Sequence, residues 1–196
     1  MNFLAHIYLS GDSPKIMVGN FIGDFVKGNQ LQSYEEDIQL GIRVHRAIDS
    51  YTDSHKVVKQ SKVRLSEKYR HYSGVIVDVY YDHFLAKNWE RFHNDPLEVY
   101  VKESYSTILS YDEILPKQVK RMLSYMIPQN WLVSYRDLDG IGQALTGLSK
   151  RTTFDSGMEF AINDLKEHYE EFESEFLNFF EDLREHVKNP DIFRLD

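Results

Sequence analysis

Apolar residues recur at intervals of three and four along most of the chain, which is the spacing typical of helices that bury one face. The first clear segment has a capping serine and a first-turn proline at Ser13-Pro14 and a stop at Gly28. Further helices are predicted from Ser33, with Glu36 placed for a capping box, to about Asp53, from Lys56 to Tyr72, and from a break at Ser73-Gly74 to near Asn94-Asp95-Pro96. The valine, isoleucine and tyrosine content at the start of the last of these leaves a strand as an alternative there.

The second half of the chain continues the helical pattern. We expect helices from Pro96 to about Leu109, around Pro116 to Met126, briefly near Trp131, from Asp137 to Ser149, and in a long final segment. That segment carries an apolar, largely aromatic stripe, interpreted as core or as a seam against other helices: Phe160, Leu165, Tyr169, Phe172, Phe176, Phe179, Leu183 and Val187. No internal repeat and no glycine-rich phosphate loop is present. The sequence therefore predicts an all-α fold, a multi-helix bundle in a single domain over residues 1–196.

Composition supports one compact domain and narrows its chemistry. The 196 residues are 42% hydrophobic and include only 10 Gly and 5 Pro, which argues against disorder and against a linker-rich chain. The absence of cysteine excludes disulfides, iron–sulfur clusters and a cysteine nucleophile, so a metal would need His, Asp, Glu, Asn or backbone oxygen as ligands. A formal net charge of -8 argues against nucleic acid as a partner.

The pattern also lacks membrane and targeting signals. No window approaches the roughly 20 uninterrupted apolar residues of a membrane span. The opening stretch MNFLAHIYLSGD has no basic region before its apolar residues, unlike a signal or transit peptide. We therefore expect no membrane partner and a cytoplasmic location.

Polar residues on the apolar helices are the candidates for chemistry. In the first predicted helix Asn20, Asp24 and Lys27 are spaced by four and three residues, which would place them on one stripe of a hydrophobic cylinder. A buried carboxylate needs a partner, so Asp24 is expected to be paired, metal-bound, protonated or at a wet cleft. The alternative is a solvated Asp24–Lys27 pair at an exposed edge. Gly19 and Gly23, four residues apart, would let a second helix approach closely.

Three more polar residues at helical spacing follow in the next predicted helix. His45, Asp49 and Asp53 are each one turn apart and share a face. Such a set suits a divalent cation that takes mixed nitrogen and oxygen ligands, and equally a base that positions water. Taken alone, a His45–Asp49 pair is more often a structural hydrogen bond or a surface salt bridge. Arg46, at the border of this face, could contact a phosphate or simply neutralise Asp49 or Asp53.

A third polar set lies near the middle of the chain. Asp78 and Asp82 align one turn apart, His83 is displaced by about 100° from Asp82, and apolar neighbours make solvated placement costly. A site and a buried structural pair are equal alternatives here, whereas His6, one turn after Asn2, is by itself more simply a core histidine. The remaining histidines sit in polar stretches and are interpreted as surface residues: His55, His71, His93, His168 and His186. Because three distant segments each deliver carboxylate or imidazole from an apolar background, we predict that they meet at a metal site inside the bundle.

Longer motifs connect these polar residues to a known family. They are Met1-Asn2-Phe3-Leu4-Ala5-His6, Gly19 to Gly28, Gly41 to Asp49, Asp78 to Leu85 and Trp131 to Asp137, with further agreement around Leu145 to Arg151. Over most of the chain these motifs resemble the bacterial acyl carrier protein phosphodiesterases, also called ACP hydrolases. The resemblance implies a helical fold distantly related to the HD phosphohydrolases, hydrolysis of holo-acyl carrier protein to the apo-protein and 4'-phosphopantetheine, and a divalent metal, usually manganese. Asp82-His83 reverses the His-Asp order of HD enzymes, so their ligand list does not transfer directly.

Together, the residues and the resemblance predict a metal-dependent phosphodiesterase. The predicted metal ligands are Asp24, His45, Asp82, His83 and His6, with Mn²⁺ as the expected ion. Asp49 or Asp24 would orient or deprotonate the attacking water, while Arg46 and Lys27 would balance the charge of the transition state. Asn20 and Lys27 are the predicted substrate contacts. The alternatives are an HD-like phosphohydrolase acting on a nucleotide or another small phosphoester, and a non-catalytic helical protein that binds the carrier.

The expected partner raises an electrostatic difficulty, because an acidic enzyme and an acidic carrier protein repel each other at long range. Local positive charge would have to overcome this repulsion. The candidate sets are Lys56, Lys59, Lys62, Arg64, Lys68 and Arg70 in the helix from Lys56 to Tyr72, then Lys150-Arg151, and then Lys117, Lys120 and Arg121. We predict that one set borders the cleft and makes carrier binding sensitive to salt, the alternative being an ordinary mixed-charge surface.

Overall fold

The computed structural model describes residues 1–189, which form helices joined by turns and contain no strand, so the strand alternative near residue 75 is wrong. The α-helices are α1 (Phe3–Tyr8), α2 (Pro14–Ile22), α3 (Glu36–Ser54), α4 (Lys56–Tyr69), α5 (Ser73–Lys87), α6 (Leu97–Ser110), α7 (Lys117–Met126), α8 (Trp131–Ser134), α9 (Leu138–Ser149), α10 (Ala161–Glu167) and α11 (Tyr169–Val187). Short 3₁₀ turns cover Gly23–Phe25, Gly28–Ser33, Arg70–Tyr72, Trp89–Arg91, Asp112–Ile114 and Met158–Phe160. The predicted single all-α domain is confirmed for this range, and residues 190–196 of the predicted boundary lie outside it.

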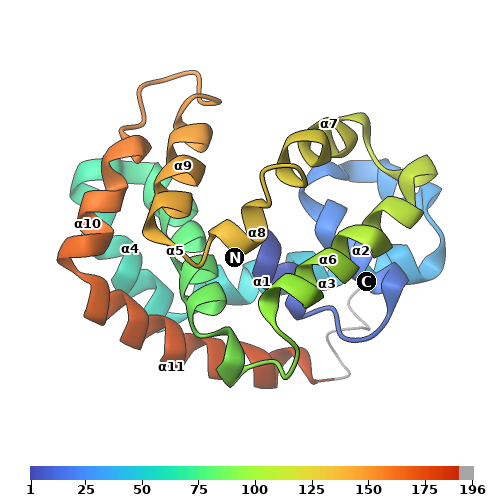
Figure 1. Cartoon of the computed structure of the whole chain (residues 1–196), viewed down its shortest axis with the longest axis horizontal. Coiled ribbons are helices and arrows are strands. Elements are labelled where there is room, and N and C mark those ends of the chain that lie inside the picture. Colours follow the sequence, from blue (N-terminus) through green and yellow to red (C-terminus); the bar gives the residue numbers. More distant parts are fainter. Residues whose placement is uncertain (190–196) are drawn as a thin grey trace.

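The short helix α1 lies at the centre of the molecule, between two groups of helices (Figure 1). It packs against α2 on one side and against α5 on the other. Helix α2 in turn packs on α3 and α6, and α5 packs on α4 and α9. Helix α11 runs beneath both groups in Figure 1 and contacts α3, α4 and α5. None of the helices among residues 1–189 combines the length and apolar character needed to cross a membrane.

Two of the predicted helix boundaries are wrong in a way that changes the site. Helix α2 ends at Ile22, because the chain turns through Gly23–Phe25 and is extended at Val26. Asn20, Asp24 and Lys27 therefore do not form one helical stripe. Helix α3 begins at Glu36 and not at Ser33, since the preceding residues form a 3₁₀ turn that starts at Gly28, where φ is +52°.

The long final segment is two helices and not one, with a break at His168. Most of its predicted stripe is buried: Leu165, Phe172, Phe176, Phe179, Leu183 and Val187. Phe160 is instead 59% exposed, because it lies in the 3₁₀ turn that precedes α10, and Met158 of the same turn is buried. The stripe thus forms core as predicted, except at the exposed Phe160 and the partly buried Tyr169.

Helices α2 and α3 approach each other closely at two glycines, Gly19 and Gly41. The sequence predicted a close approach at Gly19 but not the partner Gly41. A Cβ atom on Gly19 would lie 2.2 Å from the carbonyl oxygen of Ile38, and one on Gly41 would lie 2.3 Å from that of Ile16. Real Cβ atoms do not approach backbone so closely, so both positions require glycine at this helix spacing. The contact fixes the distance between Asn20 on α2 and His45 on α3.

Replacing Gly41 with alanine should destabilise the protein by about 2 to 4 kcal/mol, because the new methyl group has to push two buried backbones apart. Urea unfolding followed by circular dichroism measures the change. The matched control is Gly142→Ala on α9, where the nearest atom to the new Cβ is Ile162 Cγ1 at 3.9 Å. This control should be stabilised by about 0.5 to 1 kcal/mol through helix propensity. Equal stabilities of the two variants would contradict the glycine contact.

Candidate functional site

Asp82 of α5 holds the N-terminus of α1. Its Oδ2 accepts a hydrogen bond from the backbone N–H of Leu4 at 2.8 Å, and its Oδ1 accepts from Asn2 and Ala5, both at 3.3 Å. The first N–H groups of a helix have no partner within the helix, and the fully buried carboxylate supplies one. Burial raises the pKa of Asp82 to about 7, against the opposing effect of these backbone donors. The structure thus directs Asp82 to the backbone of α1 and not to the cluster described below, contrary to its predicted role as a ligand.

His6, one turn further along α1, is positioned by Asn20 of α2. The amide nitrogen of Asn20 donates to the carbonyl oxygen of His6 at 2.8 Å and to Ser10 Oγ at 3.0 Å. The amide oxygen therefore faces the imidazole, where it accepts a hydrogen bond from His6 Nδ1 at 2.8 Å. Asn20 is fully buried and its amide is engaged by His6 and Ser10, so the predicted contact with substrate is not seen among its bonds. Its observed contacts instead orient the His6 ring.

His45 of α3 stacks on His6 and is held in the same way. Its Nδ1 donates to the backbone carbonyl oxygen of Asn20 at 2.8 Å, and the two rings lie 4.0 Å apart at 20°. Gly23 makes room for the ring, since a Cβ there would lie 2.3 Å from His45 Cγ. With hydrogen on Nδ1, each neutral imidazole carries its lone pair on Nε2.

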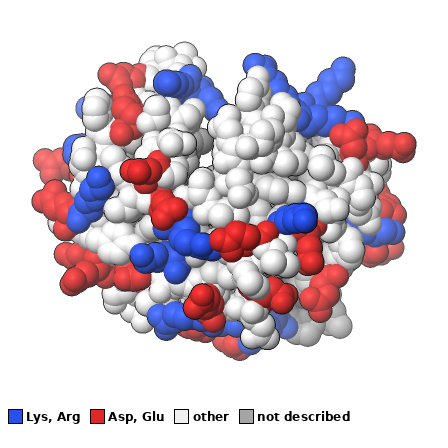
Figure 2. Space-filling view, viewed as in Figure 1, with Lys and Arg blue, Asp and Glu red and all other residues white. Residues whose placement is uncertain are grey.

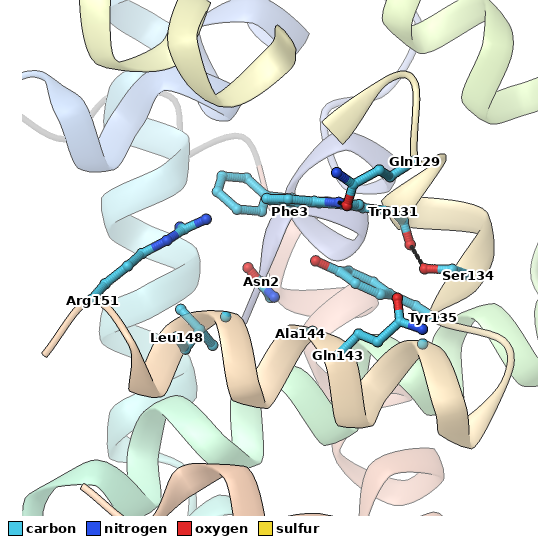
Figure 3. Close-up of a pocket in the computed structure, with 12 residues that line it drawn as sticks. Asn2, Phe3, Gln129, Trp131, Ser134, Tyr135, Gln143, Ala144, Leu148 and Arg151 are labelled. Atoms are coloured by element: carbon cyan, nitrogen blue, oxygen red, sulfur yellow. Dashed lines mark hydrogen bonds between the residues drawn. The ribbon is translucent and has the colours of Figure 1, made fainter. Parts of the chain in front are cut away.

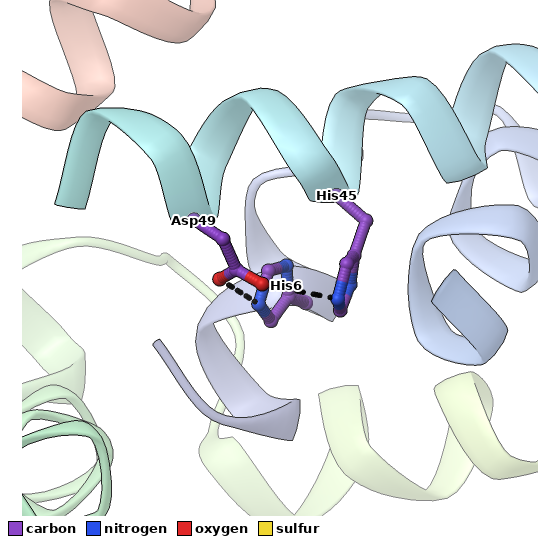
Figure 4. Close-up of side chains that lie close together, drawn as sticks. All are labelled: His6, His45 and Asp49. Carbon is purple, nitrogen blue, oxygen red and sulfur yellow. Dashed lines mark ion pairs between the residues drawn. The ribbon is translucent and has the colours of Figure 1, made fainter. Parts of the chain in front are cut away.

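Asp49 lies where both Nε2 atoms point (Figure 4). Its Oδ1 is 3.2 Å from His6 Nε2 and its Oδ2 is 3.2 Å from His45 Nε2. One ligand atom from each of the three residues lies within 4.8 Å of the others, and no other His, Asp or Glu group within residues 1–189 has this arrangement. Asp24 Oδ1 is also 3.2 Å from His45 Nε2, and its side chain is 68% exposed. We call His6, His45 and Asp49 the histidine–aspartate cluster.

The cluster combines groups of opposite charge, including the Met1 amino group, which lies 3.5 Å from Asp49 Oδ1. Burial and the neighbouring His45 lower the pKa of His6 to about 4, so His6 is neutral near pH 7, and its Nε2 is a buried nitrogen without a hydrogen-bond partner. Burial alone would lower the pKa of His45, but hydrogen bonds to Asp24 and Asp49 raise it to about 9. The pKa of Asp49 is lowered, because its interactions with the imidazoles and with the amino group of Met1 outweigh its burial. An ionised carboxylate therefore faces one imidazole lone pair and one protonated ring.

The residues present fit a divalent metal ion. Bonds of about 2.1 Å to a shared ion place neighbouring ligand atoms about 3 Å apart, close to the two separations of 3.2 Å between Asp49 and the histidines. Two imidazoles and a carboxylate suit manganese, iron or zinc. Asn20 fixes both rings through Nδ1, which is how outer hydrogen bonds usually orient metal-binding histidines. A small cavity that borders His6, His45 and Asp24 leads to the cluster.

Several predicted candidates lie outside the cluster. Both ring nitrogens of His83 are bonded elsewhere, Nδ1 to the carbonyl oxygen of Tyr135 and Nε2 to Tyr169 Oη, each at 2.8 Å. Asp53 points away and pairs with Lys62 Nζ at 2.6 Å. Of the three segments predicted to meet, those of Asp24 and His45 lie together, whereas the Asp82-His83 pair of α5 bonds elsewhere and α1 contributes His6 in its place.

Arg46, Lys27 and Asp78 lie in other surroundings. The exposed guanidinium of Arg46 donates to the carbonyl oxygen of Val26 at 3.1 Å, so it reaches the turn that carries Asp24. Lys27 is exposed on the same segment. Asp78 accepts a hydrogen bond from the amino group of Met1 at 3.0 Å. The five histidines interpreted as surface residues are all at least partly exposed: His55, His71, His93, His168 and His186.

Sequence reasoning underrated two members of the cluster and missed a third contributor. His6 was the weakest candidate, because a lone histidine in an apolar segment is usually structural. Asp49 was predicted to act on water, although its two oxygens face both imidazoles. The spacing of Gly19 and Gly23 predicts close helix packing, but the space beside Gly23 is filled by the His45 ring. A glycine whose missing Cβ faces a histidine leaves no signal in the sequence.

Comparisons with known proteins agree on one family. A sequence profile described as "Acyl carrier protein phosphodiesterase" matches residues 1–183. An acyl carrier protein phosphodiesterase from Photorhabdus laumondii is 32% identical over 196 residues, covering 100% of this chain and 99% of the relative. Those from Pectobacterium atrosepticum and Escherichia coli are each 33% identical, covering 98% and 94% of this chain and 100% and 96% of the relatives. No solved structure matches the chain, so the HD-like part of the fold prediction stays a prediction.

Replacing Asp82 with alanine should lower the free energy of unfolding by about 2 to 4 kcal/mol, because it leaves buried N–H groups of α1 without an acceptor. Urea unfolding in metal-free buffer measures this loss. The control Asp53→Ala removes an exposed carboxylate and should change stability by less than about 1 kcal/mol. An Asp82→Ala variant of unchanged stability in metal-free buffer would contradict the capping role.

Proposed function

This chain belongs to the acyl carrier protein phosphodiesterase family, and we propose that it uses a divalent metal to hydrolyse holo-acyl carrier protein to apo-protein and 4'-phosphopantetheine. Membership makes it a phosphodiesterase, a hydrolase of phosphoric diesters. The observation that carries the proposal is the convergence of two imidazole Nε2 atoms and the Asp49 carboxylate beside a cavity. We propose Mn²⁺ as the ion.

The residues in and beside the cluster have different proposed roles, which follow from their exposure. His6, His45 and Asp49 would hold the ion, which when bound supplies Lewis acidity toward a phosphodiester oxygen and a water molecule. Asp24 is more exposed than the cluster, and its hydrogen bond to His45 lowers its pKa, so it is ionised near neutral pH. A carboxylate oxygen of Asp24 is therefore suited to accept the proton of the attacking water. Arg46, held at Val26, is placed to offset negative charge that develops on the phosphoryl oxygens.

Replacing Asp49 with asparagine should abolish both metal binding and hydrolysis. Mn²⁺ at about one hundred times its Kd should stabilise the unsubstituted protein by about 3 kcal/mol, and this gain should vanish in the variant. Turnover of holo-carrier protein, followed by the mass of the carrier, should fall by more than about a hundredfold, beyond the loss typical of an outer hydrogen-bond change.

The matched control for this test is Asp53→Asn, which makes the same chemical change one turn later on α3. It should keep both the Mn²⁺ stabilisation and the turnover, because Asp53 contacts Lys62 and not the cluster. Full turnover in Asp24→Ala and His45→Ala would contradict the assignment. Turnover of nucleotides without any activity on holo-carrier protein would favour a small-molecule phosphohydrolase instead.

Three cations of α4 are already paired within the protein, which makes α4 a weaker candidate for the surface that binds the carrier protein. On α4, Lys62 pairs with Asp53, Arg64 with Glu175 and Lys68 with Asp164. These cations are neutralised within the protein. Lys150 and Arg151 at the end of α9 are exposed and have no ion-pair partner among residues 1–189. On the face shown in Figure 2, basic side chains lie near the top on both sides of a hollow, over the end of α9 and over α7.

We propose that the acidic carrier docks at Lys150 and Arg151. The double variant Lys150→Glu/Arg151→Glu should raise the KM for holo-carrier protein by about tenfold at low salt, with little change in kcat. The difference should shrink in about 0.5 M salt, where exposed charges are screened. The matched control, Lys56→Glu/Lys59→Glu on α4, changes the net charge equally and should leave KM within about twofold. Equal effects of the two double variants would contradict this docking surface.

A further inference from the structure

A second pocket, larger than the cavity at the cluster, lies beside the start of α1 (Figure 3). It has a volume of about 170 Å³ and is enclosed by the first residues of α1, by α8 and by α9. Phe3, Trp131 and Leu148 supply apolar walls, and Arg151 extends across its opening in Figure 3. The family motifs Trp131 to Asp137 and Leu145 to Arg151 contribute half of its lining residues, although none of the proposed catalytic groups comes from them.

The pocket adjoins the histidine–aspartate cluster through α1. Asn2 and Phe3 line both this pocket and the small cavity that borders His6, His45 and Asp24. His6 follows Phe3 by three residues, a rise of about 4.5 Å along the helix. The pocket and the small cavity at the cluster are therefore neighbours along α1.

The lining combines apolar surface with amide groups. Gln129 accepts a hydrogen bond from Trp131 Nε1 at 3.0 Å through its Oε1, which leaves its NH₂ group available to a ligand. The exposed amide of Gln143 has no hydrogen-bond partner among residues 1–189 and faces the pocket in Figure 3. Arg151 lies with its Cζ 5.7 Å from the centre of the Trp131 ring. The pocket thus offers donors and acceptors along a narrow apolar wall, a lining suited to an alkyl chain that contains amides.

We propose that this pocket binds the pantetheine arm of the substrate, an inference that rests on the proposed function. The arm is a branched alkyl chain with two amide groups and a terminal thiol, attached through its phosphate to the carrier. With the phosphate at the cluster, the dimethyl group meets Phe3, the amides meet Gln129 and Gln143, and the thiol end lies toward Leu148. The pocket then distinguishes holo-carrier protein from other phosphodiesters, because it recognises the arm separately from the reacting phosphate.

The test uses pantetheine itself, which carries the arm but no phosphate. Calorimetric titration of the full chain should show saturable binding, and pantetheine should inhibit hydrolysis of holo-carrier protein competitively. Gly147→Leu places a side chain into the pocket at a position where a Cβ atom meets nothing within 4 Å. It should weaken pantetheine binding and raise the KM for holo-carrier protein by about tenfold or more, while Mn²⁺ stabilisation is unchanged.

Two further variants control this experiment. Gly142→Leu makes the same substitution on α9 outside the pocket and should leave both constants within about twofold. Gln143→Ala alters an exposed side chain, so it can be used if Gly147→Leu does not fold. It should raise the pantetheine Kd by about fivefold. Hydrolysis of holo-carrier protein with no pantetheine binding and with unchanged KM in Gly147→Leu and Gln143→Ala would overturn the pocket assignment alone. Absence of hydrolysis by the unsubstituted protein with Mn²⁺ would overturn the proposed function. In that case, pantetheine binding that is lost in Gly147→Leu would still support the pocket assignment.

Discussion

The site depends on keeping a buried six-residue helix hydrogen-bonded at its start. Helix α1 lies between α2 and α5, and Leu4, Ala5 and Ile7 are fully buried. Such a short helix has little stability of its own, so its position comes from packing and from the Asp82 carboxylate that accepts its first N–H groups. This one contact orients both sides of α1. His6 belongs to the histidine–aspartate cluster, while Asn2 and Phe3 border the proposed arm pocket.

The second constraint is the hydrogen bonding of the stacked imidazoles. Asn20 supplies the acceptor for both rings, its side chain for His6 and its main chain for His45, so one buried residue sets both tautomers. The Nε2 atoms then face Asp49, and the buried lone pair on His6 Nε2 is costly without a partner. Binding of a metal would remove that cost and displace the proton of His45. Metal affinity, protonation and stability are thereby coupled in this part of the fold.

Charge is distributed in a way that suits an acidic partner in spite of the net charge of -8. Carboxylates of α3, α10 and α11 neutralise three cations of α4 within the molecule. The cations at the end of α9 are exposed beside the pocket next to α1. Docking and recognition of the arm would then use adjoining surfaces. The carrier would be recognised at the rim, and its prosthetic group in the pocket below.

Local spacing in the sequence determined the helices, the buried aromatic stripe of α11 and the placement of His45 and Asp49 on one face, because these depend only on residues within a few turns. It also indicated that polar groups from distant apolar segments would meet. Tertiary packing decided which groups met. Asp82 and Asn20 are as polar and as buried as His6, yet they bond to backbone and to an imidazole, because a buried group binds whichever partner the neighbouring helix brings within about 3 Å. The partner of a buried polar group depends on contacts between helices, and such contacts produce no periodic pattern in the sequence.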